Sequence, residues 1–403
     1  MKTNNNIPAY RFQGYTDAWE LRKLGEVAEI ITGTTPSTFD EENYGGKRLF
    51  VSPVDIQDNR YITETLTTLT EKGHLLGREL RPGATLFVSI GSTIGKVAQL
   101  KDFATSNQQI NAVISGDKID DDFIFTGLEK KSAQIKNLSS QQAVPIINKS
   151  TFSNIEFEFP TLPEQEVIGT FFSTLDCHIT LHQRKLDTLK EQKKTYLKLL
   201  FPAKGLTKPA LRFQGFEDDW KEVKLGEILK ERNEQIAENE EYPLMSFVQG
   251  VGVTPKGERY DRSFLVKEDN KKYKKTELGD FIYSSNNLET GSIGFNKTGK
   301  AVISPVYSIF YSKDEFESSF IGILSQRKDF IAKMIKFRQG VVYGQWRIHE
   351  NDFLQILLHI PTKAEMEKII TFFQTLDQEI AQVEDKLASL KEMKKTLLRK
   401  LFV

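Results

Sequence analysis

The chain has 403 residues, of which 39% are hydrophobic and 27% charged, and its 55 basic and 55 acidic side chains give a formal net charge of zero. This length predicts two or three domains, and the neutral balance argues against a polycation that grips nucleic acid by overall charge. One cysteine, Cys177, excludes a disulfide framework, and without a signal-peptide core or a run of about 20 apolar residues we expect a cytoplasmic protein with no membrane partner.

The first recognisable stretch is a short lead-in, residues 8–26, with the sequence PAYRFQGYTDAWELRKLGE. It recurs 201 residues later, at residues 209–227, as PALRFQGFEDDWKEVKLGE. Most positions of the two copies are identical. We expect Trp19 and Trp220 to pack each lead-in against the base of a domain.

Residues 27–158 follow and predict short strands separated by turns. The segments ITGTTPST, KRLFVSPVDI and TLFVSIG are β-branched or apolar runs between Gly and Pro breakers. The stretch GSTIGK, residues 91–96, lacks the spacing and the final Ser or Thr of a phosphate-binding loop. We interpret it as a glycine-bounded hairpin that could present Lys96 to a DNA phosphate.

A long helix is predicted next, at residues 160–201, and a second copy occupies residues 361–402 with more than half of the positions identical. Apolar residues recur every seven positions in both copies, which is typical of a coiled coil, and the obvious partner of each helix is the other copy. The predicted helix–helix interface consists of Ile168, Phe172, Leu175, Ile179, Leu186, Leu189, Tyr196, Leu200, Ile369, Phe373, Leu376, Ile380, Val383, Leu387, Leu390, Leu397 and Leu401.

Two lysines, Lys193 and Lys394, fall on the same seam near its basic end. They could reach solvent or accept a carboxylate from another subunit, or the coil could fray there. His178 and His182 lie four apart on one helix face, but the second copy carries a glutamate and a valine there, so we predict no metal site.

The second divergent stretch, residues 228–358, contains GDFIYSS, GSIGFNKTG and KAVISPVYSIFYS, which resemble strands of the first stretch. The sequence therefore predicts an α+β protein with an internal repeat, in which two domains with twisted sheets are separated by two long coiled-coil helices. The expected segments are a first domain at 1–158, a helix at 159–203, a linker at 204–208, a second domain at 209–358 and a helix at 359–403.

No catalytic constellation is present. The chain has no nucleotide-hydrolase loop, no H-E-x-x-H pair and no N-P-P-[FY] motif of adenine methyltransferases. The divergent stretches do contain Asn, Gln, Arg and Lys side chains suited to base edges and phosphates, although a loop amide is often merely solvated. The candidate DNA-binding residues are Lys96, Asn107, Gln108, Gln109, Lys136, Gln141, Gln142, Lys149, Asn286, Asn287, Arg338, Gln339, Gln345, Trp346 and Arg347. A lysine run at 271–275 is flanked by acidic residues and is interpreted as surface.

The repeated pattern resembles the specificity subunit of type I restriction–modification systems. The resemblance rests on ITGTTPST followed by YGGKRLFVSPVDI, on LGE after the tryptophan lead-in, on SQQAVPIINKSTFSNIEFEFPTLPEQEVI and on KLDTLKEQKKTYLKLLF. The second helix begins TKAEMEKII and lacks the Pro and Gln of the first.

This resemblance implies that each variable domain is a target recognition domain that reads one half of a bipartite, asymmetric site in double-stranded DNA. The two long helices would pack antiparallel, which gives the two halves a pseudo-two-fold relation. They would set the spacer between the halves and dock two modification (methyltransferase) subunits. Restriction subunits, which are ATP-dependent translocases and nucleases, would join that core. S-adenosylmethionine and ATP would then bind partner subunits, and this chain would hold neither cofactor and catalyse nothing. The alternative is a non-enzymatic coiled-coil scaffold that presents two protein- or glycan-binding domains.

Overall fold

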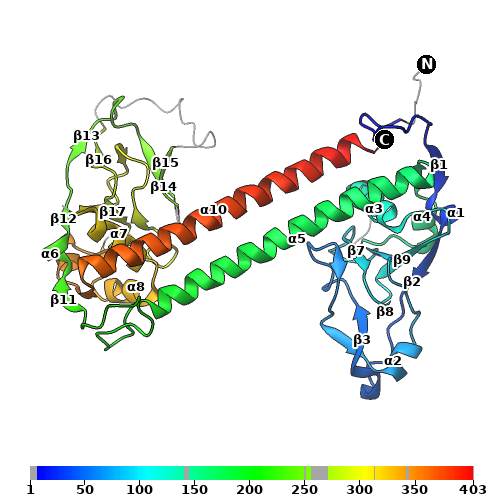
Figure 1. The fold of residues 1–403 in the computed structure, drawn as a ribbon, viewed down its shortest axis with the longest axis horizontal. Helices are drawn as coiled ribbons and strands as arrows, with labels where there is room; N and C mark the ends of the chain where they lie inside the picture. Colours follow the sequence, from blue (N-terminus) through cyan, green and yellow to red (C-terminus); the bar gives the residue numbers. More distant parts are fainter. Residues whose placement is uncertain are drawn as a thin grey trace. The chain divides into compact units, whose positions relative to one another are not determined.

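The computed structural model describes residues 7–139, 145–248, 251–255, 271–312, 314–341 and 345–402. The chain forms two compact units, which we call unit 1 (Met1–Lys185 with Val383–Val403) and unit 2 (Leu186–Gln382). Both units combine helices and sheets, which confirms the expected α+β class (Figure 1). The segment bounds inferred from the sequence stay a prediction.

Two sheets form the larger part of unit 1. The larger has the strand order β2-β9-β6-β7-β4, with bounds Ala28–Thr32, Ile110–Ser115, Thr85–Val88, Val97–Leu100 and Tyr61–Ile62. The smaller has the order β5-β3-β8, with bounds Thr67–Leu69, Tyr44–Val51 and Ala104–Ser106. Strands β3 and β8 pair in parallel, as do β4 and β7, and the other ladders are antiparallel. Helix α3 (Asp121–Asn137) and the short elements η1 (Glu41–Asn43) and α2 (Glu71–Leu75) complete this part.

The principal sheet of unit 2 repeats this order. Strands β12, β20, β17 and β18 (Lys230–Glu231, Ser308–Tyr311, Phe281–Tyr283 and Ile293–Phe295) correspond to β2, β9, β6 and β7. The faint likeness of these strands in the sequence therefore reflects one shared sheet. Smaller sheets contain β13, β16 and β19 (Gln235–Ile236, Tyr273–Thr276 and Ala301–Ile303), then β14 with β15 (Met245–Val248 and Gly252–Pro255) and β21 with β22 (Gln339–Val341 and Gln345–Arg347). Helices α7 and α8 span Glu315–Leu324 and Lys328–Ile335.

The lead-ins form the same small frame in each unit. In unit 1, β1 (Glu20–Lys23) pairs with β10 (Glu156–Phe159), next to α1 (Leu24–Val27) and α4 (Lys149–Ser153). In unit 2, β11 (Lys221–Lys224) pairs with β23 (Leu357–Ile360), next to α6 (Leu225–Ile228) and α9 (Glu350–Leu354). The two registers differ by 201 residues at every position, so the duplication seen in the sequence is also a duplication of structure.

The long helices are α5 (Leu162–Leu199) and α10 (Lys363–Lys400), and each passes from one unit into the other. In unit 1 the beginning of α5 lies beside the end of α10, where the Phe172 and Phe402 rings are 6.1 Å apart. In unit 2 the end of α5 lies beside the beginning of α10, where the Tyr196 and Phe372 rings are 4.9 Å apart. The helices are therefore antiparallel, as expected. None of the helices in the described residues is long and apolar enough to cross a membrane.

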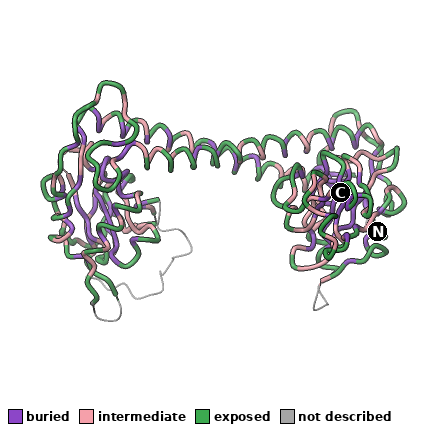
Figure 2. The backbone as a smooth tube through the Cα atoms, turned by 90° about the horizontal axis from the view of Figure 1, so that it is seen from below, coloured by how far each residue is buried: buried purple, intermediate pink, exposed green. Residues whose placement is uncertain are grey.

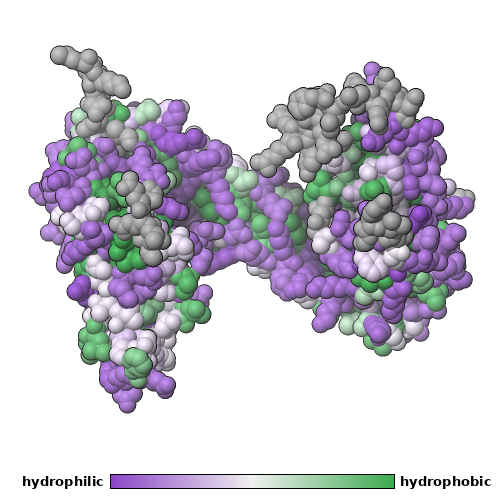
Figure 3. All heavy atoms as spheres, turned by 180° about the vertical axis from the view of Figure 1, so that it is seen from behind, coloured by the Kyte–Doolittle hydropathy of each residue, from purple (hydrophilic) through white to green (hydrophobic). Residues whose placement is uncertain are grey.

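Most residues of the seam are buried, and buried and exposed segments alternate along the two long helices (Figure 2). Four of them, Ile179, Tyr196, Ile380 and Leu397, are half-buried. Those that are buried are Ile168, Phe172, Leu175, Leu186, Leu189, Leu200, Ile369, Phe373, Leu376, Val383, Leu387, Leu390 and Leu401. Hydrophilic residues cover most of the face seen in Figure 3.

Both tryptophans of the lead-ins are buried in aromatic clusters, as expected. Trp19 packs edge-on against Phe123 and Phe402 at ring distances of 5.8 and 5.9 Å. Trp220 meets Phe201 and Phe320 at 5.9 and 5.8 Å. Two residues after the end of each long helix, a phenylalanine thus belongs to the core of one unit.

Two kinds of ion pair repeat in the frame. Arg11 donates to both oxygens of Glu164 at 2.8 and 2.6 Å, and Arg212 does the same to Glu365 at the same distances, which ties each lead-in to the start of a long helix. Such bidentate pairs add geometric specificity as well as energy. In each unit they hold the lead-in in the same position on the helix start.

The seam lysines form the second kind of pair. Lys394 lies 2.6 Å from Asp176 in unit 1, and Lys193 lies 2.6 Å from Asp377 in unit 2. The partners of both lysines are therefore aspartates of the other long helix of the same chain. Both lysines therefore pair within the chain instead of extending into solvent.

Candidate nucleic-acid interface

The candidate residues of unit 2 gather around the β21–β22 hairpin. The Trp346 backbone N–H donates to Asn286 Oδ1 at 2.6 Å, and the Ile348 N–H donates to Ser285 Oγ at 3.0 Å. These bonds fix β22 against the turn that follows β17. Arg338, the residue before β21, donates to both carboxylate oxygens of Glu289 at 2.7 Å, so its guanidinium is already paired within the protein.

An open pocket of about 710 Å³ lies beside this hairpin. Its rim carries the exposed side chains of Asn286, Asn287, Gln345, Trp346 and Arg347, all of which the sequence had indicated. Gln339, also exposed, lies opposite Arg347 on the hairpin and makes a 3.4 Å contact with Asp352 outside the pocket. The structure therefore brings most of the second-domain candidates together on one polar surface.

Buried polar residues form the floor of this pocket. Ser284, Ser285, Ser308 and Lys274 are each less than a tenth exposed. Lys274 belongs to the lysine run that the sequence had placed at the surface, and that interpretation was wrong for this residue. The reason is the alternation of β16, where Lys274 and Thr276 are buried and Tyr273 and Lys275 are only half-buried.

Two carboxylates face the same space. Burial raises the pKa of Glu231, and the nearby Glu350 carboxylate raises it further. Burial also tends to raise the pKa of Glu350, but bonds from its own backbone N–H and from the Ser308 hydroxyl, at 2.9 Å, lower it overall. Arg347 lies 3.4 Å from Glu350. Two carboxylates and two cations thus share the pocket.

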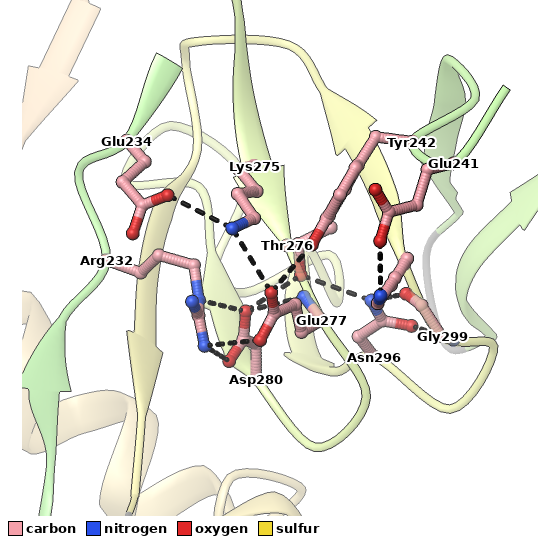
Figure 4. A network of polar contacts seen from close by, with 11 residues as sticks. Arg232, Glu234, Glu241, Tyr242, Lys275, Thr276, Glu277, Asp280, Asn296 and Gly299 are labelled. Carbon is pink, nitrogen blue, oxygen red and sulfur yellow. Dashed lines mark hydrogen bonds and ion pairs between the residues drawn. The ribbon is translucent and has the colours of Figure 1, made fainter. Parts of the chain in front are cut away.

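The neighbouring lysine, Lys275, faces a different environment (Figure 4). Its ammonium lies 3.1 Å from Glu234 and 3.3 Å from Glu277. Arg232 pairs with the buried Asp280 at 2.7 Å in the same network. These charged groups pair with one another and hold β12 and β16 to the following turn, so we assign them a structural role.

The candidates of unit 1 are arranged around the β8–β9 turn. Asn107 Nδ2 donates to Gln109 Oε1 at 3.1 Å, and the Thr35 hydroxyl donates to Gln108 Oε1. A side chain at Gly33 would collide with the backbone oxygens of 106 and 107, so this glycine allows the ITGTTPST loop to lie against the turn. Gln108 is exposed and its neighbours are half-buried.

The lysine candidates of unit 1 do not join this turn as a group. Lys96 is half-buried and donates to the Ile56 carbonyl oxygen at 2.9 Å. Lys136, at the end of α3, and Lys149, at the start of α4, are exposed. Gln141 and Gln142 lie outside the described residues.

Sequence reasoning missed Glu231 as a member of the site and placed Lys274 on the surface. Only Asn, Gln, Arg and Lys were considered as readers of bases, although carboxylates also accept hydrogen bonds from base amino groups. The burial of Lys274 follows from the pairing of β16, and the sequence YKKT carries no alternation that could have identified it.

The comparisons with known proteins agree with this architecture. Residues 16–191 match the family model described as the type I restriction modification DNA specificity domain. The type I restriction enzyme HindI specificity subunit of Haemophilus influenzae is 30% identical over 166 residues, which are 39% of this chain and only 36% of that relative. The MjaIX specificity subunit of Methanocaldococcus jannaschii is 23% identical over 95% of this chain and 92% of its own length.

Solved structures share the fold over the whole length. The S subunit of a type I restriction–modification system from M. genitalium superposes with a TM-score of 0.68 at 17% identity, covering 98% of this chain and 99% of that one. A chain from a study of complex assembly and conformational transition of the type I system gives a TM-score of 0.50 at 15% identity, over 97% and 99%.

Fold and site together define a duplicated scaffold that presents two unlike polar surfaces on one repeated frame. Residues 16–191 match the type I restriction modification DNA specificity domain, and the chain is similar over nearly its whole length to a type I specificity subunit.

Proposed function

We propose that this chain is the DNA sequence-recognition subunit of a type I restriction–modification complex. The domain of unit 1 reads one half of a bipartite, asymmetric site in double-stranded DNA, and the domain of unit 2 reads the other half. One observation carries this proposal. The frame is repeated down to its ion pairs, whereas the exposed surfaces next to it differ in sequence and charge. A fixed frame with two different surfaces suits a half-site reader built on one polypeptide.

The long helices set the spacer between the two halves and dock two modification subunits. A neighbour from a study of type I complex assembly supports such partners. We infer that methyl transfer from S-adenosylmethionine and ATP-driven translocation and cleavage take place on the modification and restriction subunits, in the cytoplasm. This chain itself is non-catalytic. A net charge of zero fits a subunit whose partners supply much of the contact with DNA phosphates.

The other candidate, a scaffold for protein- or glycan-binding domains, is not favoured. The relatives and structures described above are type I specificity subunits or belong to that system. No contact in the described residues points to a different partner.

A domain exchange tests the proposal. The chain is co-expressed with its modification subunit, and methylome sequencing of the host identifies the methylated motif. Replacing residues 27–158 by those of a relative is expected to change one half of the motif and leave the other half and the spacer intact. The matched control, replacement of residues 228–358, should change only the opposite half. A change in both halves after either exchange, or an unmethylated host, would contradict the proposal.

A further inference from the structure

The pocket beside the β21–β22 hairpin contains a buried lysine whose charge is balanced only through space, by the Glu231 and Glu350 carboxylates among the described residues. Lys274 is 7% exposed and contributes to the pocket floor. Its ammonium makes no hydrogen bond and no ion pair with any residue that the structure describes. Burying an ammonium group costs several kcal/mol unless the charge is compensated. A polar ligand that enters the pocket and accepts hydrogen bonds would compensate it.

Glu231 provides the complementary group. It is half-buried on the edge strand β12, and its carboxylate also has no hydrogen-bond donor among the described side chains. Its electrostatic partners are Glu350, Lys274 and Arg347, all of which line the same pocket. The pocket thus offers a free donor and a free acceptor within one small volume.

The charge of the pocket decides between phosphate and base as its ligand. Glu231 and Glu350 balance Lys274 and Arg347, so the four formal charges sum to zero. A phosphate would be attracted by the cations but repelled by two carboxylates at close range. A neutral group that both donates and accepts hydrogen bonds has no such penalty, and the edge of a base pair is such a group.

The rim adds donors to this arrangement. The amide oxygen of Asn286 is used by the Trp346 backbone N–H, so the Asn286 NH2 group is the part that remains for a ligand. Lysine has a flexible four-carbon stem and glutamate two methylenes, and neither free side chain is held by a bond. Both can therefore extend toward an edge that is presented at the pocket mouth.

The repeat shows that this chemistry is specific to unit 2. The position 201 residues before Glu231 is Ile30, which is 3% exposed in the core of unit 1. The corresponding positions for Arg347 and Glu350 are Ile146 and Lys149. The first domain therefore lacks both carboxylates and the arginine at these equivalent positions. Unit 2 thus carries charged side chains at positions of the shared scaffold where unit 1 carries apolar or basic ones.

We propose that this pocket reads a G·C base pair in the half-site of the second domain, with Lys274 donating to guanine O6 and N7 and Glu231 accepting from the cytosine N4 amino group. In the major groove a G·C pair presents exactly this neighbouring set of acceptors and donor, and lysine–guanine and glutamate–cytosine are favourable pairings. The inference rests on the proposed function.

Two substitutions test the inference, Lys274→Met and Glu231→Gln, each in the full chain co-expressed with its modification subunit. Lys274→Met keeps the length of the side chain and removes its charge, and Glu231→Gln keeps the shape. The readout is the methylome motif, together with the thermal melting of the purified complex. We expect the preference for G·C over A·T to fall about tenfold at one position of the second half-site in both variants. The first half-site serves as an internal control and should stay unchanged.

Lys272→Met is the matched control, because Lys272 is exposed two residues away and does not line the pocket. This variant should keep the wild-type motif. A second half-site without a G·C pair, or an unchanged motif in Glu231→Gln, would overturn the inference while leaving the proposed function intact. If Lys274→Met fails to fold, Glu231→Gln alone decides. A wild-type complex that methylates no bipartite motif would overturn the proposed function and this inference with it.

Discussion

Replacing Lys394 should destabilise unit 1 more than the equivalent replacement of Lys193 destabilises unit 2. Its ammonium lies 2.6 Å from both Asp176 and Glu129 and is 14% exposed, while the Asp176 side chain is 6% exposed. Its repeat equivalent, Lys193, is 20% exposed and pairs only with Asp377, which is 35% exposed. The perturbation is Lys394→Met, with Lys193→Met as the matched variant.

The expected costs differ because the burial differs. Removing one partner of a buried ion pair leaves an uncompensated charge and costs about 3 kcal/mol or more. Removing one partner of a largely solvated pair costs about 1 kcal/mol or less. Arg60 lies 3.2 Å from Asp176, so Asp176 keeps a cationic partner in Lys394→Met. The carboxylate that loses its cation in this variant is that of Glu129. The double variant with Glu129→Gln should recover part of the lost stability.

The pH dependence gives an independent check. Burial raises the pKa of Glu129 above its ordinary value, although Lys394 opposes this rise. A carboxyl group with a raised pKa in the folded state favours folding at low pH, and that contribution is lost as the pH rises through the folded-state pKa. Without Lys394 the pKa should rise further. The stability lost in Lys394→Met should therefore be smaller at pH 5 than at pH 7.5.

Urea denaturation of the purified full chain at both pH values measures these differences. Hydrogen exchange of residues 121–137 then assigns the loss to unit 1, since Glu129 lies on α3. Equal losses for Lys394→Met and Lys193→Met, or a loss that does not depend on pH, would refute the reasoning.

Two further substitutions probe the helix entries. Gly169→Ala would place a Cβ against the Asp120 carboxylate that caps α3, so we expect a net loss of stability of about 1–3 kcal/mol by thermal denaturation despite the better helix propensity of alanine. The control Thr170→Ala, at an exposed position, should be nearly neutral, and a stabilised Gly169→Ala would show that the contact is not tight. Met366→Gln would bury an amide in the apolar core of unit 2 and should lower the free energy of unfolding by about 1–3 kcal/mol. Met366→Leu should lower it less, and equal melting temperatures for the two variants would rule out this explanation.

The sequence predicted the features that depend on local periodicity and on the duplication. Seven-residue spacing identified the long helices, because their seam residues stay on one face whatever the partner is. It could not supply the partners of Lys193 and Lys394. Those depend on how far one antiparallel helix is shifted along the other, and the seam residues alone are compatible with several shifts.

The recognition surface was predictable only in part. Trp346 and Arg347 were found because they precede the second helix at the place where SQQAVPII precedes the first. Glu231 was missed, because its environment is created by strands that are distant in sequence. Lys274 and Lys275 are adjacent and chemically identical, yet one lines a pocket and the other closes an ion network, so only the pairing of β16 distinguishes them.

The core of unit 1 is assembled from segments at both ends of the chain, since Phe402 stacks on Phe123 at 5.3 Å. Unit 2 is a single continuous stretch, residues 186–382. During synthesis on the ribosome, unit 2 can therefore finish folding while the earlier-made domain still exposes the apolar site that Phe402 will fill. The domain made first is completed last, so the nascent chain needs protection from aggregation at its N-terminal half.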